Sequence, residues 1–214
     1  MRVTIASLAI AATCLFGPRS ADAAQICPPG QPCRAYLTRV ITPVQQQTPV
    51  WCWAASLSAL FGFFGHPVDQ TKIVARYFPP PGITTGPPWV MANALNSTWI
   101  DDNGVTFSVS SLITDNYSGP AAPHQVSNAM IINSVASEVP VFYGDQTHAM
   151  IIVQVDFIPT PGGPQIVRGG AVDPYPFDLR PFCPPAPYAC VGPGFRNLQP
   201  NELIGLFAAI PSVH

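Results

Sequence analysis

Residues 46–64 of the chain read QQTPVWCWAASLSALFGFF, and this stretch decides the fold that we expect. From Cys52 to Phe64 the residues are apolar on nearly every side and include no proline. A helix that is apolar all round is normally buried in the core of a protein. The turn-forming Gln47-Thr48-Pro49 comes just before it. The pattern therefore predicts a buried helix that begins at Cys52 and ends near Gly65.

Working outward, the patterns predict further helices and then strands. Helices are expected over residues 67–77, 89–95 and 123–137, with a proline- and glycine-rich loop over 79–88, and strands over 100–113, 139–143, 149–157 and 165–172. Residues 159–164 join the last two strands and predict a hairpin. A last helical turn over 201–206 and a terminal strand complete the chain. Because helices come first and an antiparallel sheet follows, the expected fold class is α+β.

Composition narrows the class of protein. The 214 residues suit one domain with a sizeable core. Hydrophobic residues make up 48% of the chain and charged residues 9%, with a net charge of −2. This balance argues against a disordered chain and against a nucleic-acid binder that relies on positive charge. No segment reaches the roughly 18 uninterrupted apolar residues of a membrane span, so no membrane span is expected.

The first 23 residues have the form of a signal peptide. Arg2 gives a positive start, residues 3–17 are small and apolar, and Ala21-Asp22-Ala23 fits the small-x-small rule for cleavage before Ala24. We therefore expect a secreted or periplasmic protein. Its mature chain is predicted to consist of an N-terminal segment, residues 24–39, and one domain, residues 40–214.

The cysteines of the mature chain are odd in number: Cys27, Cys33, Cys52, Cys183 and Cys190. Two proline-rich segments, 27–33 and 183–190, have a cysteine at each end, which favours two small loops that are each closed by a disulfide. Four cysteines allow three pairings, and all three leave Cys52 free. Neither pair has zinc-ligand spacing. We expect no metal and no cofactor.

Cys52 has candidate partners for nucleophilic chemistry. The positive end of a helix dipole favours a thiolate at a helix N-terminus, where the free backbone N–H can also bind an oxyanion. His148 opens the predicted strand 149–157, and Asp173 follows the next strand, so antiparallel pairing would place the two side by side. His66, His124 and His214 are interpreted as solvated polar residues. The sequence thus predicts His148 as the base and Asp173 as the group that orients it.

These residues together resemble the papain-like cysteine peptidases. Gln46 lies six residues before Cys52 in Trp51-Cys52-Trp53-Ala54-Ala55, and His148 and Asp173-Pro174 follow in order. The closer similarity is to compact bacterial secreted members and double-glycine-peptidase-like proteins. The resemblance implies the papain-like fold, Cys52 as nucleophile, His148 as general base and acid, Asp173 as its orienter and Gln46 as oxyanion donor. Gln45 and Gln47 stay open as alternatives to Gln46.

The expected function is hydrolysis of peptide bonds through an acyl-enzyme, with peptides or proteins as substrates. Two alternatives stay open: amide transfer of the transglutaminase type, and a papain-fold binding protein whose triad is inactive. We expect the loops 79–88 and 174–194 to set specificity.

Overall fold

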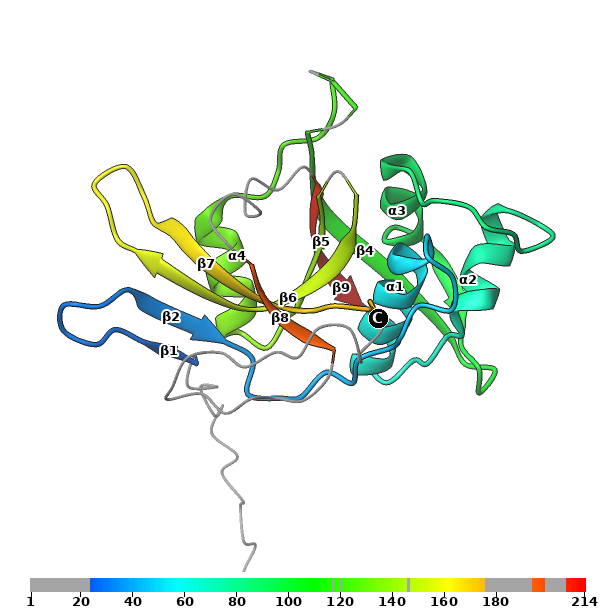
Figure 1. Cartoon of the computed structure of the whole chain (residues 1–214), viewed down its shortest axis with the longest axis horizontal. Coiled ribbons are helices and arrows are strands. Elements are labelled where there is room, and N and C mark those ends of the chain that lie inside the picture. Colours follow the sequence, from blue (N-terminus) through cyan, green and yellow to red (C-terminus); the bar gives the residue numbers. More distant parts are fainter. Residues whose placement is uncertain (1–23, 117, 120, 146, 176–193, 199–206) are drawn as a thin grey trace, which may run out of the picture.

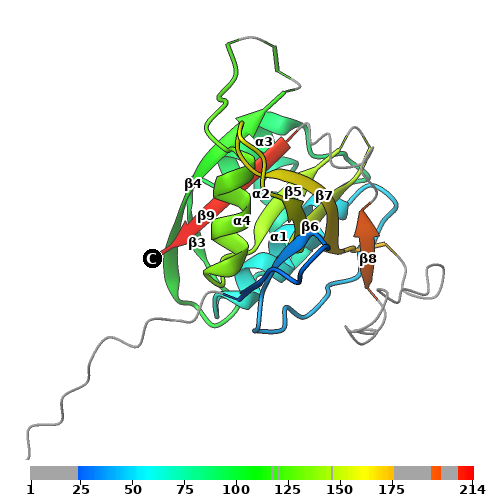
Figure 2. The ribbon, with the colours of Figure 1, turned by 90° about the vertical axis from the view of Figure 1, so that its left-hand side faces the viewer.

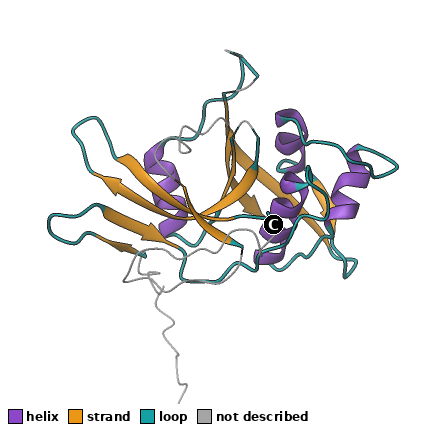
Figure 3. Cartoon of the chain, in the orientation of Figure 1, coloured by secondary structure: helices purple, strands orange, loops and turns teal. Residues whose placement is uncertain are grey.

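The computed structural model of the chain describes residues 24–116, 118–119, 121–145, 147–175, 194–198 and 207–214. The predicted signal peptide, the Cys183–Cys190 loop and the helical turn over 201–206 lie outside these residues. The described residues form four helices and nine strands, and all strand pairings are antiparallel. The strands form one curled sheet with helices on both sides (Figures 1 and 3).

The sheet is built around one long strand. Its members are β1 (Gln25–Ile26), β2 (Cys33–Tyr36), β3 (Thr98–Ile100), β4 (Thr106–Asp115), β5 (Val141–Gly144), β6 (Ala149–Ile158), β7 (Gln165–Val172), β8 (Phe195–Leu198) and β9 (Phe207–Val213). The order is β1-β2-β6-β5-β9-β4-β3, and β7 joins β6 to β8. β5 pairs with the first half of β6 and β2 with its second half, while β7 pairs with β6 from Ile151 to Ile158. The predicted 159–164 hairpin between β6 and β7 is confirmed.

Both faces of the central strands are buried. Successive side chains of a strand point to opposite faces, and β6 follows this rule: Ala149 and Ile151 belong to one core cluster, Met150 and Ile152 to the other. The helices α1 (Cys52–Phe63), α2 (Gln70–Tyr77) and α3 (Pro88–Ala94) contribute to the first cluster, and α4 (Asn128–Ala136) to the second. Figure 2 views the molecule from the side that carries α4.

Helix α1 confirms the prediction from its sequence. It begins at Cys52, and most of its side chains are buried, with Trp53, Leu57 and Phe61 among the most enclosed. The chain leaves the helix through Gly65, whose φ of 92° lies in the left-handed region that favours glycine. The N–H of His66 bonds to the carbonyl of Phe61, as in a Schellman cap. The apolar run is therefore the central helix of the first core.

Three local predictions are wrong. The single strand over 100–113 is two strands, β3 and β4, because Asp101 turns the chain by accepting the N–H groups of Asn103 and Val105. The helix over 123–137 begins only at Asn128, capped by Ser127. Helices do not all come first, because β1 and β2 precede α1 and α4 lies between β4 and β5. The antiparallel sheet and the mixed α and β composition stand.

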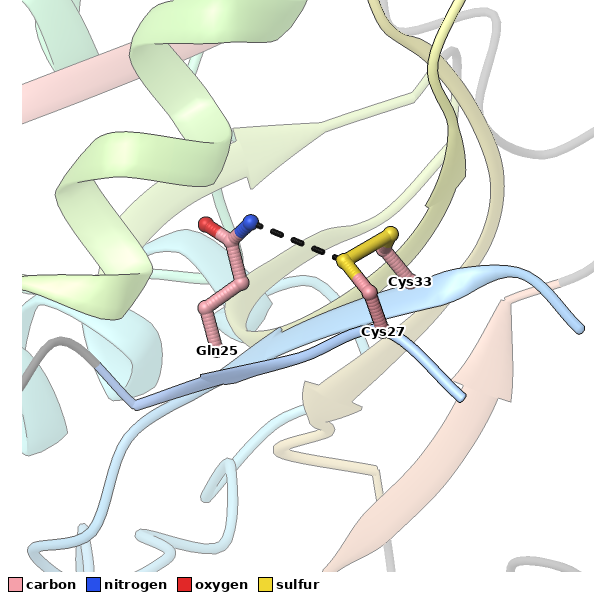
Figure 4. Close-up of a disulfide and its surroundings, with 3 residues drawn as sticks. All are labelled: Gln25, Cys27 and Cys33. Carbon is pink, nitrogen blue, oxygen red and sulfur yellow. Dashed lines mark hydrogen bonds between the residues drawn. A yellow bond between two sulfur atoms is a disulfide. The ribbon is translucent and has the colours of Figure 1, made fainter. Parts of the chain in front are cut away.

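The N-terminal segment, residues 24–39, is part of the sheet. A disulfide joins Cys27 to Cys33 across the turn between β1 and β2, as the spacing predicts (Figure 4). Arg34 on β2 forms an ion pair with Asp156 on β6, with Nη2 2.8 Å from Oδ2. Within the described residues, no helix combines the length and apolarity needed to cross a bilayer.

Candidate active site

Cys52 lies at the N-terminus of α1 and is partly exposed. It forms no disulfide. The N-cap residue, Trp51, has no side-chain hydrogen bond to the first turn, and that turn contains no acidic residue. No side chain at the N-cap therefore accepts the backbone N–H groups of the first turn, and no carboxylate in that turn offsets the positive end of the helix dipole. Backbone donors at this end of α1 are thus available to bind an anionic group.

His148 is held opposite this helix end by two sets of hydrogen bonds. Its backbone N–H donates to Asp145 Oδ1 at 2.8 Å, which fixes the turn before β6. The carbonyl of Ala149, the next residue, accepts a hydrogen bond of 3.1 Å from Ser56 Oγ. Ser56 lies four residues after Cys52, on the same face of α1. The start of β6 is thus tied to the helix that carries Cys52.

Asp173 follows β7 and reaches His148. The register pairs Ile151 with Val172, so His148 and Asp173 lie at the same end of the β6–β7 hairpin. The distance from Asp173 Oδ1 to His148 Nε2 is 2.6 Å. Because Nε2 faces Asp173, the other ring nitrogen is not engaged by Asp173, and His148 lines the same pocket as Cys52. The structure brings Cys52, His148 and Asp173 together in one row.

A fourth charged residue, Arg196, joins this row from β8. Its Nε is 2.9 Å from Asp173 Oδ2, and both side chains are largely buried. Arg196 is paired with Ala171 of β7, which brings it beside the end of that strand (Figure 1). The carboxylate of Asp173 thus lies between an imidazole and a guanidinium. Burial raises the pKa of Asp173, but the contacts with His148, the Tyr175 N–H and Arg196 outweigh burial and hold this pKa below its ordinary value.

The same contacts change the pKa of His148. Burial alone lowers it, because a buried imidazolium loses hydration. The hydrogen bonds with Asp173 and Cys52, and their charges, outweigh burial and raise the pKa of His148 to about 9. His148 therefore carries its proton at neutral pH. A protonated imidazole beside a cysteine can stabilise a thiolate and can later donate the proton to a leaving group.

Of the three consecutive glutamines, only Gln46 is buried, with 7% of its surface exposed. Its Nε2 donates to the carbonyl of Thr48 at 2.9 Å, which leaves its second N–H, and its Oε1 is buried with no hydrogen-bond partner. The backbone N–H of Gln46 bonds to Pro174, next to Asp173. Gln45 and Gln47 are exposed. Gln46 is thus the glutamine that the fold turns inward.

A pocket of about 140 Å³ opens beside Cys52 and His148. One wall is the 79–88 loop, which supplies Thr85 and Gly86. The two tryptophans that flank Cys52 hold this loop in place. Trp51 Nε1 donates to the carbonyl of Gly82 at 2.8 Å, and Trp53 Nε1 lies 3.4 Å from the carbonyl of Thr84.

We expect Gly86→Ala to destabilise the fold by about 1–3 kcal/mol, the usual cost of overpacking. A Cβ at Gly86 would overlap the ring of Trp53, which is buried and cannot move away. Gly82→Ala is the matched control in the same loop, because the nearest atoms to its Cβ are 3.9 Å away. Urea unfolding of both variants measures the difference. Equal midpoints would show that the loop does not rest on Trp53.

Four residues of the site were not predicted from sequence: Arg196, Asp145, Ser56 and Gln70. Gln70, on α2, clamps the glutamine run, since its Nε2 donates to the Gln45 carbonyl and its Oε1 accepts from the Gln47 N–H. Of the four, only Asp145 could have been found from its neighbours in sequence, because the aspartate of a turn often accepts the backbone N–H groups that follow it. The others come from distant segments.

The remaining histidines lie elsewhere. His66 forms a hydrogen bond of 3.2 Å with Asp101 and stacks on Phe107, so it is partly buried and has protein partners as well as solvent contact. His124 forms an isolated bridge with Thr114. In the part of the chain that the structure describes, no group of three or more histidine, cysteine or acidic side chains could hold a metal ion.

Comparisons with known proteins add little. No family model matches the chain, and no curated protein matches its sequence. Among solved structures, the crystal structure of UfSP from C. elegans is similar, with 14% identity and a TM-score of 0.39. The match covers 85% of this chain but 33% of that one, so the chain spans about a third of its length. A similarity this weak carries no argument about function, which must come from the site.

Proposed function

We propose that the chain is an exported cysteine peptidase of the papain-like type. One observation carries the proposal: His148 lines the same pocket as Cys52, which begins a helix, and its Nε2 is 2.6 Å from Asp173 Oδ1. A nucleophile, a base and a group that orients the base form the unit that nucleophilic catalysis requires. The order of the three residues in the chain also matches the family that the sequence resembles.

In the first half of the reaction, the Cys52 thiolate attacks the carbonyl carbon of a peptide bond. The oxyanion that forms is bound by the backbone N–H of Cys52 and by the second N–H of Gln46 Nε2. His148 gives its proton to the leaving nitrogen as the C–N bond breaks. The amine product departs, and a thioester to Cys52 remains.

In the second half, His148 is neutral and acts as a base. It takes a proton from water while the water oxygen attacks the thioester carbonyl. The C–S bond breaks, the acid product leaves, and the thiolate and the imidazolium are restored. Asp173 keeps the imidazole ring oriented in both halves, as its 2.6 Å contact with Nε2 allows.

Export is part of the proposal and rests on two features. Residues 1–23 have the form of a signal peptide. The disulfide between Cys27 and Cys33 is typical of proteins in oxidising compartments. The free thiol of Cys52 is unusual in such a compartment and is expected to be kept for its reactivity.

The proposal is tested by treating the folded protein with a mechanism-based epoxide and by digesting a mixed peptide library. We expect the epoxide to modify Cys52 in the folded chain much faster than in the unfolded chain, and new peptide termini to appear by mass spectrometry. Faster resolution of the acyl-enzyme by amines than by water would indicate a transferase instead. Labelling no faster than in the unfolded chain, with no peptide cut, would indicate an inactive binding protein.

The pKa of His148 makes a prediction about pH. Since His148 holds its proton up to a pH of about 9, peptide cleavage is expected to decline above that pH. Asp173→Asn should move this alkaline limit to lower pH by roughly one to three units, because an opposite charge raises a histidine pKa by that order. The asparagine oxygen can still accept the Nε2–H bond, so the variant removes the charge and keeps the orientation. The pH profile of kcat/KM measures the limit.

Asp101→Asn is the matched control. Asp101 pairs with His66 at 3.2 Å beyond the far end of α1, so this variant neutralises the same kind of pair away from Cys52. Its alkaline limit should equal that of the unmodified protein. A limit that stays near pH 9 in Asp173→Asn would contradict the assigned role of Asp173.

A further inference from the structure

The charges around Cys52 do not all cancel. In the proposed resting enzyme the Cys52 thiolate is balanced by the His148 imidazolium. Asp173 is balanced by Arg196, whose Nε is 2.9 Å away. One charged residue of the pocket is left over, the carboxylate of Asp145. Counted over the described residues that line it, the pocket therefore has one net negative charge.

Only one carboxylate oxygen of Asp145 accepts the hydrogen bonds that hold the turn. Oδ1 accepts the N–H of Thr147 at 2.7 Å, the hydroxyl of Thr147 at 3.1 Å and the N–H of His148 at 2.8 Å. These donors are neutral, so they orient the carboxylate without removing its charge. Among the described residues, no arginine or lysine forms an ion pair with Asp145. Oδ2 keeps its capacity to accept hydrogen bonds.

The rest of the pocket is mixed in character. Val50 and Met91 give it apolar groups, and Thr85 and Thr147 line it together with Asp145. A cavity of about 150 Å³ can hold a molecule of the size of benzene, so the 140 Å³ here suits one side-chain-sized group. A pocket with some apolar wall beside a carboxylate is suited to an aliphatic stem that ends in a cation.

We propose that Asp145 forms a subsite for a positively charged group of the substrate, an ammonium or a guanidinium, next to the bond that Cys52 attacks. This deepens the proposed peptidase function and rests on it. The group can come from a lysine or arginine side chain or from a free peptide N-terminus. Substrates with an acidic residue at that position are disfavoured, because two carboxylates in a partly enclosed pocket repel each other.

The first test uses peptides that differ only in charge. Lysine is placed in turn at each position around the cut bond and compared with uncharged norleucine, and each peptide is made with a free and with an acetylated N-terminus. We expect one position, or the free N-terminus, to raise kcat/KM about tenfold, the order of a charge-assisted hydrogen bond. Equal cleavage of the charged and neutral members of every pair would overturn the proposal.

Asp145→Asn identifies the residue responsible. Asparagine retains the Oδ1 acceptor that holds the turn and removes the charge. The ratio of lysine to norleucine cleavage should fall about tenfold, and a general loss of activity cancels in this ratio. Asp69→Asn is the matched control, because Asp69 also caps a backbone N–H, that of Thr71, but lies outside the pocket lining. A ratio that Asp145→Asn leaves unchanged would refute the assignment.

A second test does not require peptide cleavage. Methanethiosulfonate reagents that carry a trimethylammonium or a sulfonate group react with any accessible thiol, and mass spectrometry locates the product at Cys52. We expect the cationic reagent to react with Cys52 faster than the anionic one, and Asp145→Asn to reduce this rate ratio about tenfold. Added salt should also reduce the ratio, because it screens the charge of Asp145. If no peptide is cleaved while the reagent preference is as expected, the peptidase function is refuted and the subsite is kept. A reagent preference that Asp145→Asn leaves unchanged would refute the subsite.

Discussion

Cys52→Ala is expected to lower kcat/KM for peptide cleavage by about 10⁴-fold or more, because removal of the nucleophile from a catalytic unit has effects of this order. His148→Ala should cost a similar factor. The double variant should lose little beyond either single variant, because the thiolate and the imidazolium act as one unit. Initial rates on one fluorogenic peptide, at enzyme concentrations high enough to detect residual turnover, measure all three.

The control is a variant in which two other cysteines are replaced and Cys52 is kept. Replacing Cys27 and Cys33 together by serine removes the disulfide that joins β1 to β2, on the N-terminal segment and away from the pocket lining. This variant should keep cleavage activity while it remains folded, as checked by circular dichroism. Turnover by Cys52→Ala at the rate of the unmodified protein would eliminate the nucleophile assignment and with it the proposed function.

Asp156→Ala is expected to destabilise the fold by about 3–5 kcal/mol, which is a large share of the 5–15 kcal/mol that stabilises a typical domain. The side chains of Asp156 and Arg34 are 8% and 12% exposed. Removal of the carboxylate leaves the guanidinium largely buried without its main counter-charge. Because Arg34 lies on β2, the loss should also release the N-terminal segment from β6. Urea unfolding measures the free energy of unfolding.

Two comparisons separate burial from charge. Lys72→Met breaks an ion pair of 2.7 Å with Asp102 whose side chains are 59% and 34% exposed, and it should change the stability far less than Asp156→Ala does. Replacing Arg34 and Asp156 together by leucine should recover much of the loss, because no charge is then buried alone. A cost for Asp156→Ala as small as that for Lys72→Met would show that water reaches the Arg34–Asp156 pair.

Several features follow from the sequence because they depend on near neighbours. The run after Cys52 predicted a buried helix because it is apolar on nearly every side and lacks proline, and the structure has that helix. Cys27 and Cys33 are six residues apart, so a short turn brings them together. His148 and Asp173 flank a hairpin, and the pairing of its two strands is enough to make them adjacent. Local order along the chain was sufficient in each case.

Other features required the tertiary structure, because they join segments whose separation in sequence carries no pattern. Arg196 reaches Asp173 only because β8 returns to pair with β7. Gln46 was the favoured oxyanion donor with two open alternatives, and only the fold, in which Gln70 on another helix bonds to the backbone on both sides of it, shows which glutamine faces inward. Periodicity determines which side of an element is apolar, whereas long-range packing determines which elements meet. The sequence by itself therefore determined the helix that carries Cys52 and the hairpin that carries its partners. Only the tertiary structure brought the helix and the hairpin together, and with them the charges that leave Asp145 unbalanced in the pocket.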